Sequence, residues 1–247
     1  MIPEAAGVAV AAAGGLLSWS VRGRSASVFG PSVWHGPGDA KTMALTFDDG
    51  PSASTPGLLN FLAKHRVPAT FFQCGMNVER HPDIAREVLD AGHELGNHTY
   101  SHPHLYLKPA AFIEEELTRA QAAIATATGV SPKLFRAPYG QRWFGLREAQ
   151  KKLDLLGVMW TTIGRDWILT AKPVEKRILR SAKPGAILCL HDGRDIQASP
   201  DVTPMLDAVR SAIPLLLDQG FRFVTVSELL CLNPQRPALP KKPSPSA

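Results

Sequence analysis

The chain has 247 residues, of which 45% are hydrophobic and 20% are charged, and it carries a net charge of +5. This length is enough for one large domain with a substantial core or for two small ones, and the composition is that of an ordinary soluble globular protein. No block of Lys and Arg is interleaved with aromatic residues, so the sequence does not indicate nucleic-acid binding. The three cysteines cannot all pair with each other and lack the close spacing of a zinc ribbon, so we do not expect a disulfide-stapled domain.

The first distinctive segment is an apolar stretch rich in Ala and Gly, residues 5–21. It is short for a membrane span, which needs about 20 apolar residues, and Ala and Gly contribute little to insertion. It also lacks the basic n-region of a signal peptide, because Glu4 precedes it while Arg22 and Arg24 follow it. A weak membrane anchor and a helix packed on the domain fit this stretch equally well. If it spans a membrane, the positive-inside rule favours the cytoplasmic side for the rest of the chain.

From residue 43 onward, short β-prone runs alternate with helical patterns. The predicted strands are 43–47, 69–73, 94–97, 134–136, 158–161, 186–190 and 222–226. Pro82 and Pro109 each open a helix between them, and Gly129 ends the second of these helices. Further helices are predicted at 146–156, 174–182 and 202–219, the last of them bent at Pro214. Seven strands alternating with helices predict an α/β fold whose parallel sheet forms a barrel or near-barrel.

Reactive side chains follow the carboxyl ends of these predicted strands, which is where the chemistry of a (β/α) barrel gathers. They are Asp48 and Asp49 after the first strand, His98 after the third, Arg136 at the end of the fourth, Asp166 after the fifth and His191 after the sixth. Unrelated polar residues would instead scatter over both ends of the barrel. The placement therefore predicts an active site at this end.

The adjacent carboxylates and the pair His98 and His102 together indicate a metal site. Histidines four residues apart are expected on one side of a helical turn. One Asp and two His make a three-ligand site for a divalent metal such as zinc, and the second Asp is free to act as a general base. Alone, Asp-Asp-Gly is more often a turn after a strand, and His-x-x-x-His is more often a solvated helical face. Together the two patterns predict a metal hydrolase.

Five short motifs occur in order between residues 41 and 230. They are 46–50 (TFDDG), 98–102 (HTYSH), 136–140 (RAPYG), 166–167 (DW) and 190–192 (LHD). Their sequences and their order resemble those of the polysaccharide deacetylase family, whose domain is also called the NodB homology domain (carbohydrate esterase family 4). The resemblance implies a distorted (β/α) barrel with about seven parallel strands. We therefore divide the chain into an N-terminal segment (1–40), a catalytic domain (41–232) and a disordered tail rich in Pro and Lys (233–247).

The resemblance also implies a role for each motif residue. Asp49, His98 and His102 would hold the metal, Asp48 would be the catalytic base, and His191 would be the general acid that protonates the leaving amine. The other implied roles are Arg136 as the partner of Asp48, Asp166 as the partner of His191, the Tyr139 N–H as an oxyanion donor, and Pro138, Tyr139, Trp167 and Leu190 as substrate-binding residues. Of these, Trp167 and Leu190 would line a pocket for the acetyl methyl group.

The function implied is an N-deacetylase acting on N-acetylglucosamine residues of a glycan, either peptidoglycan or a chitin-like oligomer, with zinc as the expected metal and cobalt or nickel as alternatives. This substrate class favours the cell envelope as location. Two alternatives stay open: the same mechanism on an O-acetylated glycan or a non-sugar amide, and a carbohydrate-binding relic. Ile163 departs from the family pattern, because many members have Asp there. The histidines that we interpret as non-catalytic are His35, His65, His81, His93 and His104.

Overall fold

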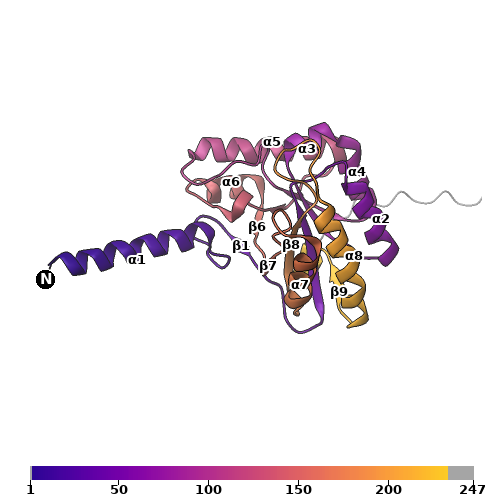
Figure 1. The fold of residues 1–247 in the computed structure, drawn as a ribbon. Coiled ribbons are helices and arrows are strands. Elements are labelled where there is room, and N and C mark those ends of the chain that lie inside the picture. The colour runs from indigo at the N-terminus through magenta and orange to yellow at the C-terminus, as the bar shows by residue number, and fades with distance from the viewer. Residues whose placement is uncertain (1, 233–247) are drawn as a thin grey trace, which may run out of the picture.

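The computed structural model describes residues 2–232, with side chains from residue 12 onward, and the tail predicted at 233–247 lies outside this range. A parallel sheet forms its centre, with strands in the order β1-β6-β5-β4-β3-β2-β8-β7 and β9 paired to β2 (Figure 1). The strands are β1 (Ser32–Val33), β2 (Thr42–Asp48), β3 (Thr70–Gln73), β4 (Glu94–Asn97), β5 (Leu134–Phe135), β6 (Leu156–Val158), β7 (Thr162–Ile163), β8 (Ile187–His191) and β9 (Arg222–Val224). All pairings among the described strands are parallel.

The sheet curls because a very short connection joins its two edges. β6 and β7 lie near opposite ends of the strand order, yet only residues 159–161 separate them. Such a connection spans at most roughly 14 Å, so the two edges must approach each other. The Met159 N–H donates to the Val33 carbonyl at 2.7 Å and the Thr161 N–H to the Ile187 carbonyl at 2.9 Å, which ties the crossing to both edges. The result is a distorted parallel barrel, and the predicted fold class is confirmed.

Beyond shifts of one to three residues at the ends of other elements, three predicted elements need correction. The strand predicted at 158–161 is wrong as one element, because the chain leaves β1 and β5 at Val158 and joins β8 only at Thr162. The helix predicted at 146–156 is too long: α6 (Leu146–Leu153) ends at Asp154, whose φ is 53°, because Leu156 already begins β6. The strand predicted at 222–226 ends at Val224, and Val226 begins the short helix α9 (Val226–Leu229).

Helices cover the outer face of the sheet (Figure 1). Those that the sequence predicts, besides α6, are α4 (Pro82–Asp90), α5 (Ala110–Thr128), α7 (Ala171–Ser181) and α8 (Thr203–Asp218), which runs through Pro214. Those that it does not predict are α2 (Thr55–His65), α3 (Gly75–Arg80) and α9. α3 and α9 are too short for a periodic apolar pattern, and the first turn of α2 contains Pro56 and Gly57.

Side chains alternate between the two faces of each strand, and this alternation positions the functional groups. On β2, Phe47 belongs to the main hydrophobic core beneath the helices, so the next residue, Asp48, points into the barrel. On β8, Leu188 and Leu190 belong to the same core, so His191 points into the barrel. Both polar residues lie at the carboxyl ends of neighbouring strands, which brings them together.

The helix α1 (Ile2–Arg22) projects away from the rest of the molecule (Figure 1). Its side chains at positions 12–19 are exposed, including Leu16 at 63% and Trp19 at 46%, and only Ser20 and Val21 are buried. Of the two alternatives for residues 5–21, packing on the domain is seen only in the last turn among the described side chains at positions 12–21. No described helix is long and apolar enough to cross a membrane. Association of this segment with a membrane stays a prediction.

Candidate active site

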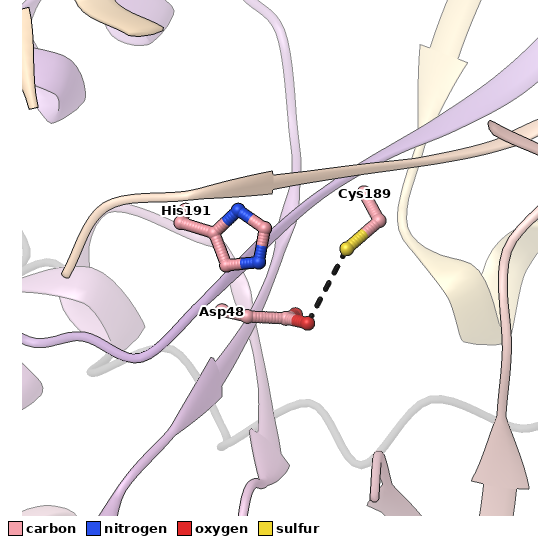
Figure 2. A group of neighbouring side chains, drawn as sticks. All are labelled: Asp48, Cys189 and His191. Carbon is pink, nitrogen blue, oxygen red and sulfur yellow. Dashed lines mark hydrogen bonds between the residues drawn. The ribbon is translucent and has the colours of Figure 1, made fainter. Parts of the chain in front are cut away.

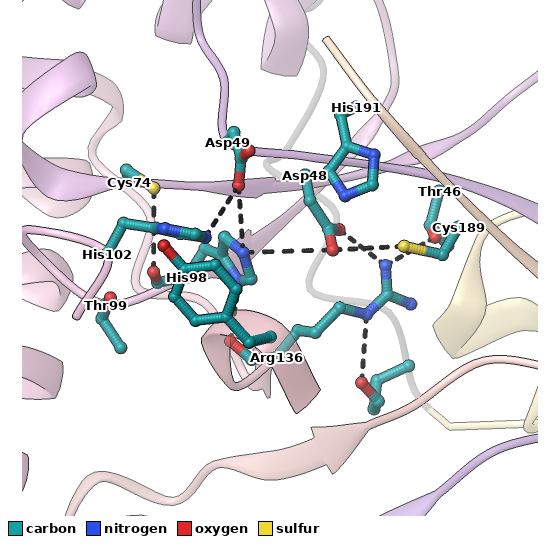
Figure 3. Close-up of polar contacts among 12 residues, drawn as sticks. Thr46, Asp48, Asp49, Cys74, His98, Thr99, His102, Arg136, Cys189 and His191 are labelled. Atoms are coloured by element: carbon teal, nitrogen blue, oxygen red, sulfur yellow. Dashed lines mark hydrogen bonds and ion pairs between the residues drawn. The ribbon is translucent and has the colours of Figure 1, made fainter. Parts of the chain in front are cut away.

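Asp48 and Asp49 point in different directions because the strand ends between them. Asp48 is the last residue of β2 and is 3% exposed inside the barrel. Asp49 has a φ of 71°, so its carboxylate turns toward the loop that follows β4. Its Oδ1 lies 3.2 Å from His98 Nε2 and 3.1 Å from His102 Nε2 (Figure 3). The Asp-His-His group predicted from the motifs therefore converges on one point.

The segment that carries His98 and His102 is not a helical turn, so that prediction is wrong. It is a loop, in which Thr99 has a φ of 65° and His102 a φ of 55°, values that an α-helix does not allow. Glu116 of α5 holds this loop by accepting two of its backbone N–H groups, at 3.0 and 2.8 Å. The two imidazole rings meet all the same, with their centroids 5.0 Å apart.

An acceptor holds the second ring nitrogen of each histidine. His98 Nδ1 lies 2.7 Å from the Arg136 carbonyl, and His102 Nδ1 lies 2.7 Å from the Asp195 carboxylate. A carbonyl can only accept, so His98 carries a proton on Nδ1, and Nε2 is the nitrogen that faces Asp49. Apart from these two imidazole contacts, the buried Asp49 Oδ1 has no hydrogen-bond partner among the described residues. This convergence of ligand atoms, backed by acceptors behind both rings, fits a divalent metal ion.

The charges in this group act on one another. Burial alone would lower the pKa of His102, but Asp49 and Asp195 outweigh it and raise the pKa to about 10. Burial would likewise raise the pKa of Asp49, but His102 and His98 hold it well below 3.8. A histidine must be neutral to bind a metal, so a metal ion bound here would have to displace the Nε2 proton of His102. We therefore expect metal affinity to fall as the pH falls.

Arg136 is fully buried inside the barrel and binds Asp48 directly. Its Nη1 donates to Asp48 Oδ1 at 2.6 Å and to Thr46 Oγ1 at 2.7 Å, and its Nε donates to the Val158 carbonyl at 3.1 Å (Figure 3). The guanidinium carbon also lies 4.1 Å from the centre of the Phe72 ring. The predicted pair of Arg136 and Asp48 is therefore present, and this charge-assisted bond holds the carboxylate in one orientation.

Asp48, Cys189 and His191 form a second group of neighbouring ligand atoms (Figure 2). The Cys189 thiol donates to Asp48 Oδ2 at 3.3 Å. Burial raises the pKa of this thiol well above 9.0, so it stays protonated and is a weak metal ligand. Both Asp48 oxygens already accept a hydrogen bond, from Arg136 and from Cys189. The Asp49 group is therefore the better candidate for the metal site.

His191 ends β8 and is held by Asp166, which lies in the loop after β7. Asp166 accepts a hydrogen bond from His191 Nδ1 at 3.0 Å and one from the His191 backbone N–H at 2.9 Å. Burial alone would lower the pKa of His191, but Asp166 outweighs it and raises the pKa to about 9. The Trp167 ring packs perpendicular to the imidazole, with centroids 5.0 Å apart. At neutral pH, His191 is therefore protonated and can donate a proton from Nε2.

A cavity of about 430 Å³ lies over these groups. The predicted site residues on its wall are Asp48, Asp49, His98, His102, Tyr139, Asp166, Trp167 and His191. Arg136 is buried behind Asp48. Pro138 and Leu190 do not line this cavity, and both are buried in the protein. Leu190 precedes His191 on β8 and therefore faces the outer core, away from the pocket predicted for the acetyl group.

Several residues on the cavity wall were not predicted. Those with polar or aromatic side chains are Arg22, His104, Gln141, Trp160, Arg194 and Asp195. His104, which we interpreted as non-catalytic, stacks on Tyr139 with ring centroids 4.0 Å apart. Arg194 and Asp195 follow the end of β8, so the rule that places chemistry after strand ends could have found them. Nothing in the local sequence marks Arg22, which reaches the cavity from the last turn of α1.

Ile163, the position that departs from the family pattern, lies in β7 and lines the cavity. Its carbonyl accepts two hydrogen bonds from Arg177, from Nε and Nη2, both at 3.1 Å. The departure therefore changes the cavity wall and leaves the Asp-His-His group and the pair of His191 and Asp166 intact.

Comparisons with known proteins agree with this geometry. A family model described as polysaccharide deacetylase matches residues 35–158. The chain is 37% identical over 201 residues to a chitooligosaccharide deacetylase of Bradyrhizobium, covering 76% of this chain and 90% of that protein. The chain belongs to the polysaccharide deacetylase family. It is also 35% identical over 192 residues to the peptidoglycan-N-acetylglucosamine deacetylase PgdA of Listeria monocytogenes, and this match covers 76% of the chain but only 39% of the Listeria protein.

Solved structures from this family share the fold. The Bc1960 peptidoglycan N-acetylglucosamine deacetylase aligns with a TM-score of 0.76 and 30% identity, covering 82% of this chain and 94% of that one. A pseudoenzyme of carbohydrate esterase family 4 from Bacillus anthracis aligns with a TM-score of 0.72 and 26% identity, covering 80% and 68%. The polysaccharide deacetylase family is thus a hydrolase family that includes pseudoenzymes, so an activity must be argued from the site.

Proposed function

We propose that this protein is a metal-dependent hydrolase that removes N-acetyl groups from N-acetylglucosamine residues of a glycan. The observation that carries the proposal is that two separately held proton-transfer groups, Asp48 and His191, share a cavity with the Asp-His-His group. Hydrolysis of an amide needs a base for the water and an acid for the leaving amine, and this cavity offers one of each.

Asp48 is the base in this proposal. Arg136 occupies its Oδ1, while its Oδ2 lies 4.0 Å from His98 Nε2 and thus faces the ligand group. A bound divalent ion would polarise the acetamide carbonyl and lower the pKa of the attacking water. Asp48 Oδ2 takes a proton from that water.

His191 is the acid in this proposal. An amine leaves only if it is protonated as the C–N bond breaks. Because Asp166 holds His191 Nδ1, the proton on Nε2 is free for the nitrogen of the substrate. The Tyr139 N–H would donate to the developing oxyanion, and Trp167, beside the imidazole, would contact the acetyl group.

Peptidoglycan or a chitin-like oligomer is the substrate that we propose, and the relatives in Listeria and Bradyrhizobium support these two glycans by their names. Zinc is the metal that we propose, with cobalt or nickel as alternatives, because two imidazoles and a carboxylate suit these ions. A sugar-binding relic is the weaker candidate, since the site contains every proposed ligand, the base and the acid.

Release of acetate and of free amine from N-acetylglucosamine oligomers tests the proposal. The purified protein is stripped of metal with a chelator and then supplied with zinc, cobalt or nickel. Equal, metal-dependent release of both products supports an N-deacetylase. An acetylated xylan in parallel tests the O-acetyl alternative, because an esterase releases acetate without amine. No release from the amino sugars with any of the three metals would contradict the proposal.

A further inference from the structure

Asp195 lies in the loop between β8 and α8 and touches three groups of the candidate active site. Its Oδ1 lies 2.7 Å from His102 Nδ1 and 3.0 Å from the Tyr139 hydroxyl, which donates to it. Its backbone N–H donates to Asp49 Oδ2 at 2.9 Å. One residue outside the family motifs therefore contacts two of the three proposed metal ligands.

Two residues of α3 hold the loop that carries Asp195. The buried Asn77 side chain donates to the carbonyl of Asp49 at 2.7 Å and to that of Asp195 at 2.8 Å. Arg80 then bonds Asn77 Oδ1 at 2.7 Å and the Ile196 carbonyl at 3.1 Å. These bonds hold the backbone of Asp195 at a constant position relative to Asp49, so the contacts of Asp195 are part of the fold.

The two contacts of Asp195 with the ligands have complementary effects. The carboxylate is the ion-pair partner of His102 Nδ1 at 2.7 Å and favours a proton on that nitrogen, which leaves Nε2 as the nitrogen for a metal ion. The backbone N–H occupies Asp49 Oδ2, which leaves Oδ1 as the carboxylate oxygen that faces both imidazoles. His98 obtains its orientation from the Arg136 carbonyl instead, which does not depend on this loop.

We propose that Asp195 is a positioning residue of the metal centre, which orients His102 through its carboxylate and Asp49 through its backbone. The proposal rests on the proposed metal-dependent function. Removal of an acceptor behind a metal-bound histidine typically lowers metal affinity by roughly 10- to 100-fold. The side chain of Asp195 is 46% exposed on the cavity wall, so a direct contact with substrate is the competing role.

Zinc and cobalt titrations of the metal-free protein, without any glycan, separate these roles. Asp195→Ala is expected to lower the affinity for both metals by roughly 10- to 100-fold. Asp195→Asn is expected to lower the affinity less, because its amide oxygen can still face His102 Nδ1 as an acceptor. Asp201→Asn is the matched control, since Asp201 lies exposed on the same loop and its carboxylate accepts the Thr203 N–H, and this variant should bind both metals as the parent does.

Each outcome bears on the proposal. Parent-like metal affinity in Asp195→Ala, with a raised KM for the glycan, would overturn it in favour of substrate binding and would leave the proposed function untouched. A parent protein that binds neither metal would overturn both this inference and the proposed function. Should Asp195→Ala fail to fold, Asp195→Asn decides the question, because a changed visible spectrum of its cobalt form reports the altered His102 ligand directly.

Discussion

Arg136 and Asp48 form an ion pair inside the barrel, with Arg136 Nη1 2.6 Å from Asp48 Oδ1 and with side chains that are 0% and 4% exposed. A buried pair of this kind is tolerated when the remaining donors also find partners, and those of the guanidinium are Thr46 and the carbonyls of Val158 and Met159. The pair joins the end of β2 to the residue that follows β5. It therefore contributes to the fold as well as to the orientation of the proposed base.

Replacement of Arg136 is expected to destabilise the protein. Arg136→Gln leaves Asp48 as a buried charge without its partner, which should cost about 3–5 kcal/mol of the free energy of unfolding. Urea denaturation at pH 7 measures this quantity. Arg222→Gln removes an exposed arginine at the start of β9 and should change it by less than about 0.5 kcal/mol. A loss below about 1 kcal/mol for Arg136→Gln would contradict the structural role of the pair.

Mutations are expected to separate the role of the base from that of the metal ligands. Asp48→Asn should lower turnover by at least roughly 100-fold, because the base is lost, yet the protein should retain its metal. His98→Ala should lose both turnover and metal, because His98 Nε2 is a proposed ligand. Metal content after dialysis, measured beside the rate of deacetylation, checks both expectations. Near-normal turnover in Asp48→Asn would show that another group is the base.

The pH profile of kcat/KM is expected to have an alkaline limb that belongs to His191. The acid must be protonated, and its pKa is about 9, so activity should fall as the pH rises through this value. Asp166→Asn removes the carboxylate that raises this pKa, so the limb should move to lower pH. Asp207→Asn, on the exposed face of α8, is the matched control. An unchanged limb in Asp166→Asn would contradict the assignment of His191 as the acid.

His93 is expected to make the stability of the fold depend on pH. Its Nδ1 accepts the Ala69 N–H at 3.1 Å, and burial lowers its pKa to about 4. In the unfolded chain the pKa is about 6.5, so the unfolded state binds more protons between these two values. Above about pH 6.5, His93 therefore does not change the free energy of unfolding. As the pH falls from there toward 4, His93 lowers this free energy progressively. The full loss is about 3 kcal/mol.

Comparison with His93→Asn isolates this contribution from that of the acidic residues. The Asn side chain keeps an acceptor for Ala69 but does not titrate. Its free energy of unfolding, measured by urea denaturation from pH 7 to 4.5, should decline less steeply than that of the parent. His35→Asn, at an exposed position, should keep the steeper decline. Identical slopes for the parent and His93→Asn would contradict the expected role of His93, whose ring packs against Phe71 of the sheet.

Local patterns were sufficient for most of the fold. Alternating strands and helices predict the parallel barrel, and Pro109 and Gly129 mark the ends of α5 because backbone conformation at these positions is a local property. Period-two alternation also shows that Leu190 and His191 face opposite sides of β8, so the sequence already contained the reason why Leu190 lies in the core. The strand predicted at 158–161 failed for a different reason. Its break is set by a change of partner strand.

By itself, the sequence determined which residues belong to the candidate site, because most of them follow strand ends in a recognisable order. Only the tertiary structure decided how these residues are held. The spacing of His98 and His102 suggests a helix, but Asn97 and Glu116 hold the segment as a loop. Asp195 meets His102, and Arg22 reaches the cavity, only because the barrel closes and brings distant loops together. Contacts of this kind depend on the curvature of the sheet, which no local periodicity encodes.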